Sequence, residues 1–141
     1  MNIESIMLTN IKTIGMDHTL AEVKELLEES GLHHIMVVDE DYTLLGVISD
    51  RDVIASVSQN IGTINENNKD RETLKKKAHQ IMTRNPVTIS KGTSVPAAAH
   101  RILTTPGSCL PVVDSNNRAI GFVSWKEVMA KLIDITVSRS A

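Results

Sequence analysis

The sequence predicts a mixed α/β (α+β) fold built from two copies of a β-α-β-β-α unit. The first observation is a repeat: the same features recur 75 positions apart, so that Gly46 and Ser49 return as Gly121 and Ser124. The second is the order of hydrophobic patterns, since short apolar runs typical of strands alternate with helical spacing in each copy. Identical residues mark the boundaries of the predicted elements: Ile6/Ile81, Met7/Met82, Asn10/Asn85, Thr13/Thr88, Ile14/Ile89, Val37/Val112, Val38/Val113, Asp39/Asp114, Gly46/Gly121, Ser49/Ser124 and Val53/Val128.

Length and composition limit the functions open to the chain. Its 141 residues suffice for one compact domain or two small subdomains that share a core. A net charge of −2 and an aromatic share of 2% argue against nucleic-acid binding, which uses basic surfaces and aromatic stacking. No apolar run approaches the ~20 residues of a membrane span, there is no signal-peptide pattern, and the single cysteine, Cys109, leaves no internal disulfide. We therefore expect a cytoplasmic protein with no nucleic-acid or membrane partner.

The first copy is expected to span residues 1–58. Thr19 and Glu22 have the spacing of a capping box, which starts a helix by satisfying its first amides, and Gly31 supplies the helix stop. The other expected elements are a helical lead-in at 1–7, a strand at 10–14, a strand at 35–39, a turn at 41–43, a strand at 45–48 and a helix from Asp50 to about Ser58.

A polar loop at 59–70 separates the copies, and the second copy is expected to span residues 71–135. Helical character returns from Arg71 to Met82, and the run Lys75–Lys77 is interpreted as a solvated face. The last helix is expected from Trp125 to about Ile135, and the tail at 136–141 carries no signal. Because each copy exposes an apolar sheet face that it cannot cover alone, we expect the copies to pack sheet to sheet with approximate two-fold symmetry and clefts between them.

The chemistry is concentrated where a strand ends and a helix begins. In Gly46–Asp52, a serine and a carboxylate three residues later stand at such a junction, and Ser124 and Glu127 repeat the pattern. A hydroxyl and an acid beside exposed helix amides can hold a sugar diol or a phosphate. The structural alternatives are that Ser49 is only an N-cap and that Asp52 is only an acid favourable to the helix dipole.

Both copies resemble the CBS motif, and the chain resembles a tandem CBS pair, or Bateman module, from Met1 to Ile135 apart from the loop at 59–70. Three features carry the resemblance in each half: Ile-Met followed by Asn and a Thr-Ile strand, a Val-Val-Asp strand end, and Gly-x-x-Ser-x-x-(Asp/Glu). The resemblance implies ligand sites for adenosine-containing molecules in the interface clefts. It implies Ser49 and Asp52 at phosphate and ribose, Val47 and Val87 beside the base, backbone at Gly107 and Ser108, and His33 and Lys126 near phosphate.

The second copy departs from the family pattern. Glu127 stands where an aspartate is expected, and its extra methylene moves the carboxylate outward. Lys12, the counterpart of Val87, is a poor wall for a base. The first cleft, built around Asp52, is therefore expected to be the competent one.

The leading functional hypothesis is a non-catalytic regulatory module that binds AMP, ADP, ATP or another adenosyl compound and signals to an effector protein. The alternative is a structural or protein-interaction module with vestigial clefts. An enzyme is not indicated, because the sequence shows no nucleophile–base pair and no phosphate-cradling loop. Metal ligation by His33–His34 and a Mg²⁺-sensing role are also disfavoured. The resemblance also implies a homodimer through the helices that begin near Asp52 and Glu127, with apolar positions Val53, Ile54, Val57, Val128 and Leu132.

Overall fold

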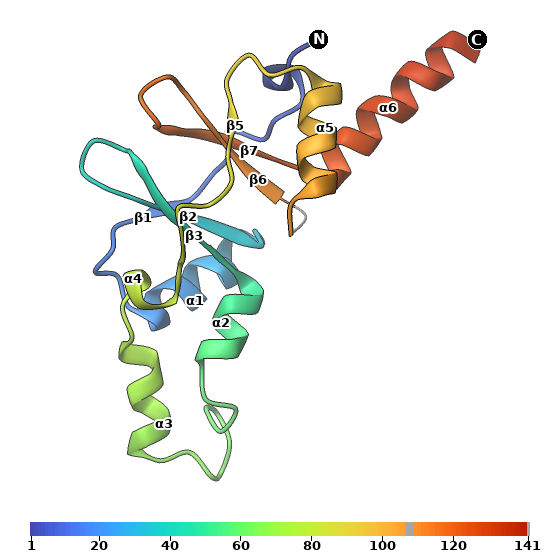
Figure 1. The fold of residues 1–141 in the computed structure, drawn as a ribbon. Helices are drawn as coiled ribbons and strands as arrows, with labels where there is room; N and C mark the ends of the chain where they lie inside the picture. Colours follow the sequence, from blue (N-terminus) through green and yellow to red (C-terminus); the bar gives the residue numbers. More distant parts are fainter. Residues whose placement is uncertain (107–108, 141) are drawn as a thin grey trace. The chain divides into compact units, whose positions relative to one another are not determined.

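The chain forms two compact units, each built on its own β-sheet (Figure 1). The structure, a computed structural model, describes the backbone of residues 1–106 and 109–140, and within these ranges the side chains as far as residue 134. The first unit comprises Lys12–Asn85. The second unit combines Met1–Ile11 with the chain from Pro86 onward.

The first unit follows the predicted β-α-β-β-α order. Its elements are β1 (Thr13–Ile14), α1 (Leu20–Ser30), β2 (His34–Val38), β3 (Leu44–Ser49) and α2 (Asp50–Ser56). β1 is parallel to β2, β2 is antiparallel to β3, and β4 (Thr83–Arg84) pairs antiparallel with β3 to complete the sheet. α1 starts and stops as predicted, because Thr19 and Glu22 form a capping box and Gly31 adopts φ 69°.

The second unit repeats this order, which confirms the mixed α/β class and the two-copy organisation. Its elements are η1 (Ile3–Ser5), β5 (Ile89–Ser90), α5 (Val95–Thr104), β6 (Cys109–Val113), β7 (Ala119–Ser124) and α6 (Trp125–Ser140). β5 is parallel to β6, and β6 is antiparallel to β7. α6 continues past the end expected near residue 135. No helix of the described chain is both long and apolar enough to cross a membrane.

A segment near the start of each copy packs into the unit that holds the rest of the other copy. Leu8 exchanges backbone hydrogen bonds with Phe122 at 2.9 and 3.0 Å, and Thr83 pairs with Val47, which is the same pairing moved by the repeat offset. Met82 belongs to the core of the first unit. This exchange of segments explains why Ile-Met recurs near the start of each copy.

Gly46 and Gly121 allow these exchanged segments to lie against the sheets. A Cβ at Gly46 would lie 2.8 Å from the Thr83 carbonyl oxygen, and one at Gly121 would lie 2.7 Å from that of Leu8. Both distances are too short for a real side chain. The two glycines are therefore required for close packing.

Each unit has its own aliphatic core. The largest fully buried side chains include Leu20, Ile35 and Ile48 in the first unit and Ile3, Ile89 and Ile102 in the second. Two positions assigned to a dimer surface belong to these cores instead: Val53 is 5% exposed and Val128 is fully buried. They face inward because the first turns of α2 and α6 cover the sheets from which they emerge. Ile54, by contrast, is 75% exposed.

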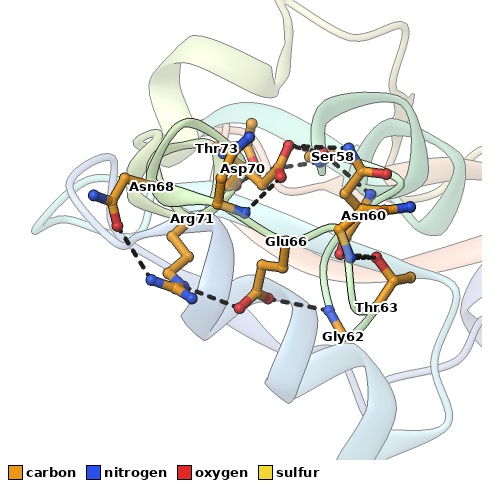
Figure 2. A network of polar contacts seen from close by, with 11 residues as sticks. Ser58, Asn60, Gly62, Thr63, Glu66, Asn68, Asp70, Arg71 and Thr73 are labelled. Carbon is orange, nitrogen blue, oxygen red and sulfur yellow. Dashed lines mark hydrogen bonds and ion pairs between the residues drawn. The ribbon is translucent and has the colours of Figure 1, made fainter.

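The connection between the copies is more structured than its polar composition indicates (Figure 2). The expected helix at 71–82 divides into α3 (Asn68–Glu72), η2 (Thr73–Lys75) and α4 (Ala78–Ile81). α3 begins early because Asn67 and Asp70 form a capping box. The helix is interrupted because the Lys76 carbonyl accepts the Leu20 amide at 2.7 Å, which holds this backbone beside the start of α1.

Asp70 is the centre of the polar network in this connection. It is 8% exposed, and its carboxylate accepts the Ser58 hydroxyl at 2.7 Å and the Asn67 amide at 2.8 Å. These hydrogen bonds lower the pKa of Asp70 below its usual range, so the carboxylate stays charged. A second pair, Arg71 and Glu66 at 2.9 Å, holds the loop from its other side (Figure 2).

Candidate functional site

The candidate site is the junction between β3 and α2, where Ser49 and Asp52 form a reciprocal cap. The Ser49 hydroxyl oxygen accepts the Asp52 amide at 3.1 Å, and Asp52 Oδ2 accepts the Ser49 amide at 2.8 Å. The local sequence favours this geometry because serine is a preferred N-cap and an acid at N3 completes a capping box. Both side chains are half-buried.

This cap leaves binding capacity unused. Within the described chain, Asp52 Oδ1 has no hydrogen-bond partner, and the Ser49 hydroxyl accepts a bond without donating one. A carboxylate has about four acceptor positions and a hydroxyl has one proton to donate. The junction can therefore cap α2 and still accept ribose hydroxyls at Asp52 while donating to an anion from Ser49. The capping and binding interpretations are compatible.

Val47 shares a face of β3 with Ser49, since side chains two residues apart lie on the same side of a strand. The burial along β3 alternates, and Val47 and Ser49 are half-buried where Gly46 and Ile48 are buried. An apolar side chain thus stands next to the Ser49–Asp52 cap, as a nucleoside site requires. Val47 also pairs with Met36 on β2.

His33 is tied to the same junction through a residue that the sequence analysis did not identify. Its Nδ1 lies 2.9 Å from Asp50 Oδ2, and the His33 carbonyl accepts the Asp50 amide at 2.9 Å. The hydrogen bond from His33 lowers the pKa of the Asp50 carboxyl. His34 pairs with Ser49 between β2 and β3, so the preceding residue, His33, lies opposite the following residue, Asp50. A prediction of this strand register could have placed the two side chains together.

His34 differs from its neighbour. It is half-buried on β2, and burial lowers the pKa of its imidazole, which favours the neutral form. Among the described residues, no group of three or more His, Cys, Asp or Glu side chains is arranged to hold a metal ion.

The corresponding junction between β7 and α6 is bonded differently. The Ser124 hydroxyl donates to Glu127 Oε2, so its proton is used within the chain. Lys126 is exposed on the first turn of α6. Nearby on β6, burial raises the pKa of the Cys109 thiol to about 12, with a smaller effect from Glu127, which argues against a reactive thiolate.

The structure groups the predicted site residues only in part. Val47, Ser49, Asp52 and His33 belong to the first unit, whereas Val87 and Lys126 belong to the second. Val87 is 39% exposed and lines a hollow beside α5. Gly107 and Ser108 lie outside the described residues.

Comparison with known proteins gives the same domain pattern. The model of the CBS domain matches residues 3–59 and 78–134. A CBS domain-containing protein of Dictyostelium discoideum is 35% identical over 135 residues, which cover 94% of this chain and 92% of that protein. The homoserine O-acetyltransferase of Methanococcus vannielii is 31% identical over 126 residues, but these span 89% of this chain and only 24% of the enzyme.

Solved structures show the same fold. The structure of CBSX2 in complex with AMP superposes with a TM-score of 0.79 at 26% identity, covering 96% of this chain and 98% of that one. A second structure of this CBS-pair protein, from Arabidopsis thaliana, gives a TM-score of 0.79 at 27% identity, with 96% of each chain covered.

Proposed function

Because the chain belongs to the CBS domain family and carries two CBS domains in tandem, we propose that it is a regulatory module that binds an adenosine-containing ligand at the β3–α2 junction. The observation that carries this proposal is the Ser49–Asp52 cap, in which one carboxylate oxygen and the hydroxyl proton have no partner among the residues that the structure describes. The similarity to CBSX2, which was solved with AMP, supports the choice of ligand class. AMP, ADP, ATP and other adenosyl compounds share the ribose and the base.

The proposed contacts divide by chemistry. Asp52 accepts the ribose hydroxyls, and charge-assisted hydrogen bonds of this kind are about twice as strong as neutral ones. Val47 and Val87 flank the base. His33, Ser49 and Lys126 meet phosphate.

The response to the ligand is proposed to pass to an effector protein, without catalysis by this chain. The relatives favour such a role, because the match covers only 24% of the homoserine O-acetyltransferase, so CBS sequence there accompanies a larger enzyme. We also propose a homodimer. Its apolar contacts would come from exposed side chains such as Ile54 on α2 and Met129 on α6, which is 48% exposed. The cytoplasmic location stays a prediction.

A structural module with unoccupied clefts is the second candidate. The observation that favours it is that Ser49 and Asp52 already satisfy one another, so the junction is stable without a ligand. The free Asp52 oxygen is then simply hydrated.

Thermal denaturation with adenosine, AMP, ADP, ATP and S-adenosylmethionine separates these candidates. A ligand present at one hundred times its Kd should stabilise the folded chain by about 2.7 kcal/mol. Guanosine and GMP are the matched controls, since they carry the same ribose and phosphate on another base. A midpoint that does not move with any adenosyl compound at millimolar concentration would favour the structural module.

A further inference from the structure

A groove in the second unit lies along α5, and its described lining includes neither Ser124 nor Glu127. Two adjoining hollows of about 360 and 220 Å³ share Ala97 and Arg101. The larger is lined by Val87, Ala97, His100, Arg101, Thr104 and Thr105. Its volume is at the lower end of the range for small-molecule sites.

The sequence of α5 produces this groove. Val95, Ala98 and Ile102 are buried against the sheet, so residues at 97, 101 and 104, spaced by three and four, share another face of the helix. Ala97 has the smallest side chain on that face and leaves room beside β5. β5 is an edge strand of the described sheet, which has the order β5-β6-β7.

The groove has the polarity of an anion site. Among the described residues, no aspartate or glutamate lines either hollow, whereas hydroxyl-bearing side chains line them at Thr88, Ser90, Thr93, Thr104 and Thr105. The ion pairs among the described residues join other groups, so the Arg101 guanidinium is not neutralised by a carboxylate. Arginine presents a planar set of donors that matches phosphate oxygens.

We infer that this groove binds the phosphoryl group of a small ligand and that Arg101 is the residue that selects for it. His100 supplies a further donor on the same helix, whereas the Thr104 hydroxyl already donates to the His100 carbonyl at 3.0 Å. The nucleoside part of this inference rests on the proposed function, because Val87, which was assigned to the base, lines the same hollow. The phosphoryl group can belong to a nucleotide bound with its phosphate at Arg101, in place of the phosphate contacts proposed above at His33, Ser49 and Lys126, or to a free phosphate compound. Both present the same oxygens to Arg101.

Calorimetric titration with adenosine, AMP and inorganic pyrophosphate tests the inference. The wild-type chain should bind AMP more tightly than adenosine. Arg101→Ala should weaken AMP and pyrophosphate binding about ten- to a hundredfold, the loss expected for one charged hydrogen bond, and leave adenosine binding unchanged. Arg101→Lys should restore part of the affinity, because it keeps the charge but not the planar donors. Arg101 is exposed, so these variants should fold normally.

The control is Arg118→Ala, which removes an exposed arginine of the same unit that lines neither hollow. It should bind all three compounds as the wild type does. If Arg101→Ala retains wild-type affinity for AMP and pyrophosphate, the inference is wrong, even where adenosine binding upholds the proposed function. If pyrophosphate binds through Arg101 but adenosine does not bind at all, the groove is an anion site and the adenosyl proposal fails.

Discussion

Removing the Asp52 carboxylate is the sharpest test of the proposed site. Asp52→Ala deletes the free oxygen Oδ1 together with Oδ2, which accepts the Ser49 amide at 2.8 Å. A hydrogen bond to a charged group contributes about 1.5–3 kcal/mol, and each 1.4 kcal/mol is a factor of about ten in Kd. Asp52→Ala should therefore weaken adenosyl-ligand binding about ten- to a hundredfold.

A second variant separates lost binding from a lost cap. In Asp52→Asn the amide oxygen can still accept the Ser49 amide, so the cap of α2 persists and only the charge is removed. Loss of a charge near a helix start costs about 0.3–1 kcal/mol, which should lower the melting temperature by a few degrees. Ligand binding should weaken in this variant while the fold stays intact.

Calorimetry with AMP on folded variants measures the effect, and Glu127→Ala is the matched control at the equivalent position of the second copy. Glu127→Ala should change the Kd little, because the Ser124–Glu127 pair is not expected to form a competent site. Equal losses from Asp52→Ala and Glu127→Ala would mean that both clefts bind. Unchanged binding in both Asp52 variants would refute the placement of the ligand.

Three further predictions concern the fold. Gly46→Ala should destabilise the chain by about 1–3 kcal/mol in urea unfolding, because its Cβ would meet the Thr83 carbonyl at 2.8 Å, whereas Gly15→Ala, with its closest neighbour at 3.7 Å, should not. Asn67→Ala should lower the free energy of unfolding by about 0.5–2 kcal/mol and speed amide hydrogen exchange at the start of α3, because it removes the helix cap. Asn67→Asp should preserve the cap, so equal exchange rates in the two variants would contradict this prediction. The His33–Asp50 hydrogen bond should stabilise the fold above pH ~4, the usual pKa of an aspartate, and this stabilisation should be lost as the pH falls through the lowered pKa of Asp50. In acid unfolding experiments, the stability of Asp50→Asn should therefore lack this pH-dependent contribution.

The fold could be predicted because its signals are local and occur twice. The Thr19–Glu22 capping box and the stop at Gly31 depend only on neighbouring residues, and the structure confirms both. The exchange of segments between the copies could not be predicted, since it depends on contacts such as Leu8 with Phe122 that are distant in sequence. The early start of α3 was missed because its cap lies inside a stretch interpreted as a loop.

The candidate site could be predicted less completely than the fold. The Gly-x-x-Ser-x-x-Asp pattern located Ser49 and Asp52, but not the His33–Asp50 pair, which arises from the register between β2 and β3. The burial of Val53 was also missed. Its apolar character suits a core and an interface equally, and only the direction in which α2 leaves the sheet decides between them.

The difference between the two junctions has a basis beyond the length of the acidic side chain. In the first copy the carboxylate bonds the serine amide, and the serine oxygen accepts the Asp52 amide, so the hydroxyl proton stays available. In the second copy the longer Glu127 side chain accepts a hydrogen bond from the Ser124 hydroxyl itself. A serine whose proton is already donated cannot donate it to a ligand phosphate. The first junction can therefore both cap a helix and bind an anion, whereas the Ser124 hydroxyl is engaged by Glu127, and this difference supports the placement of the ligand at Asp52.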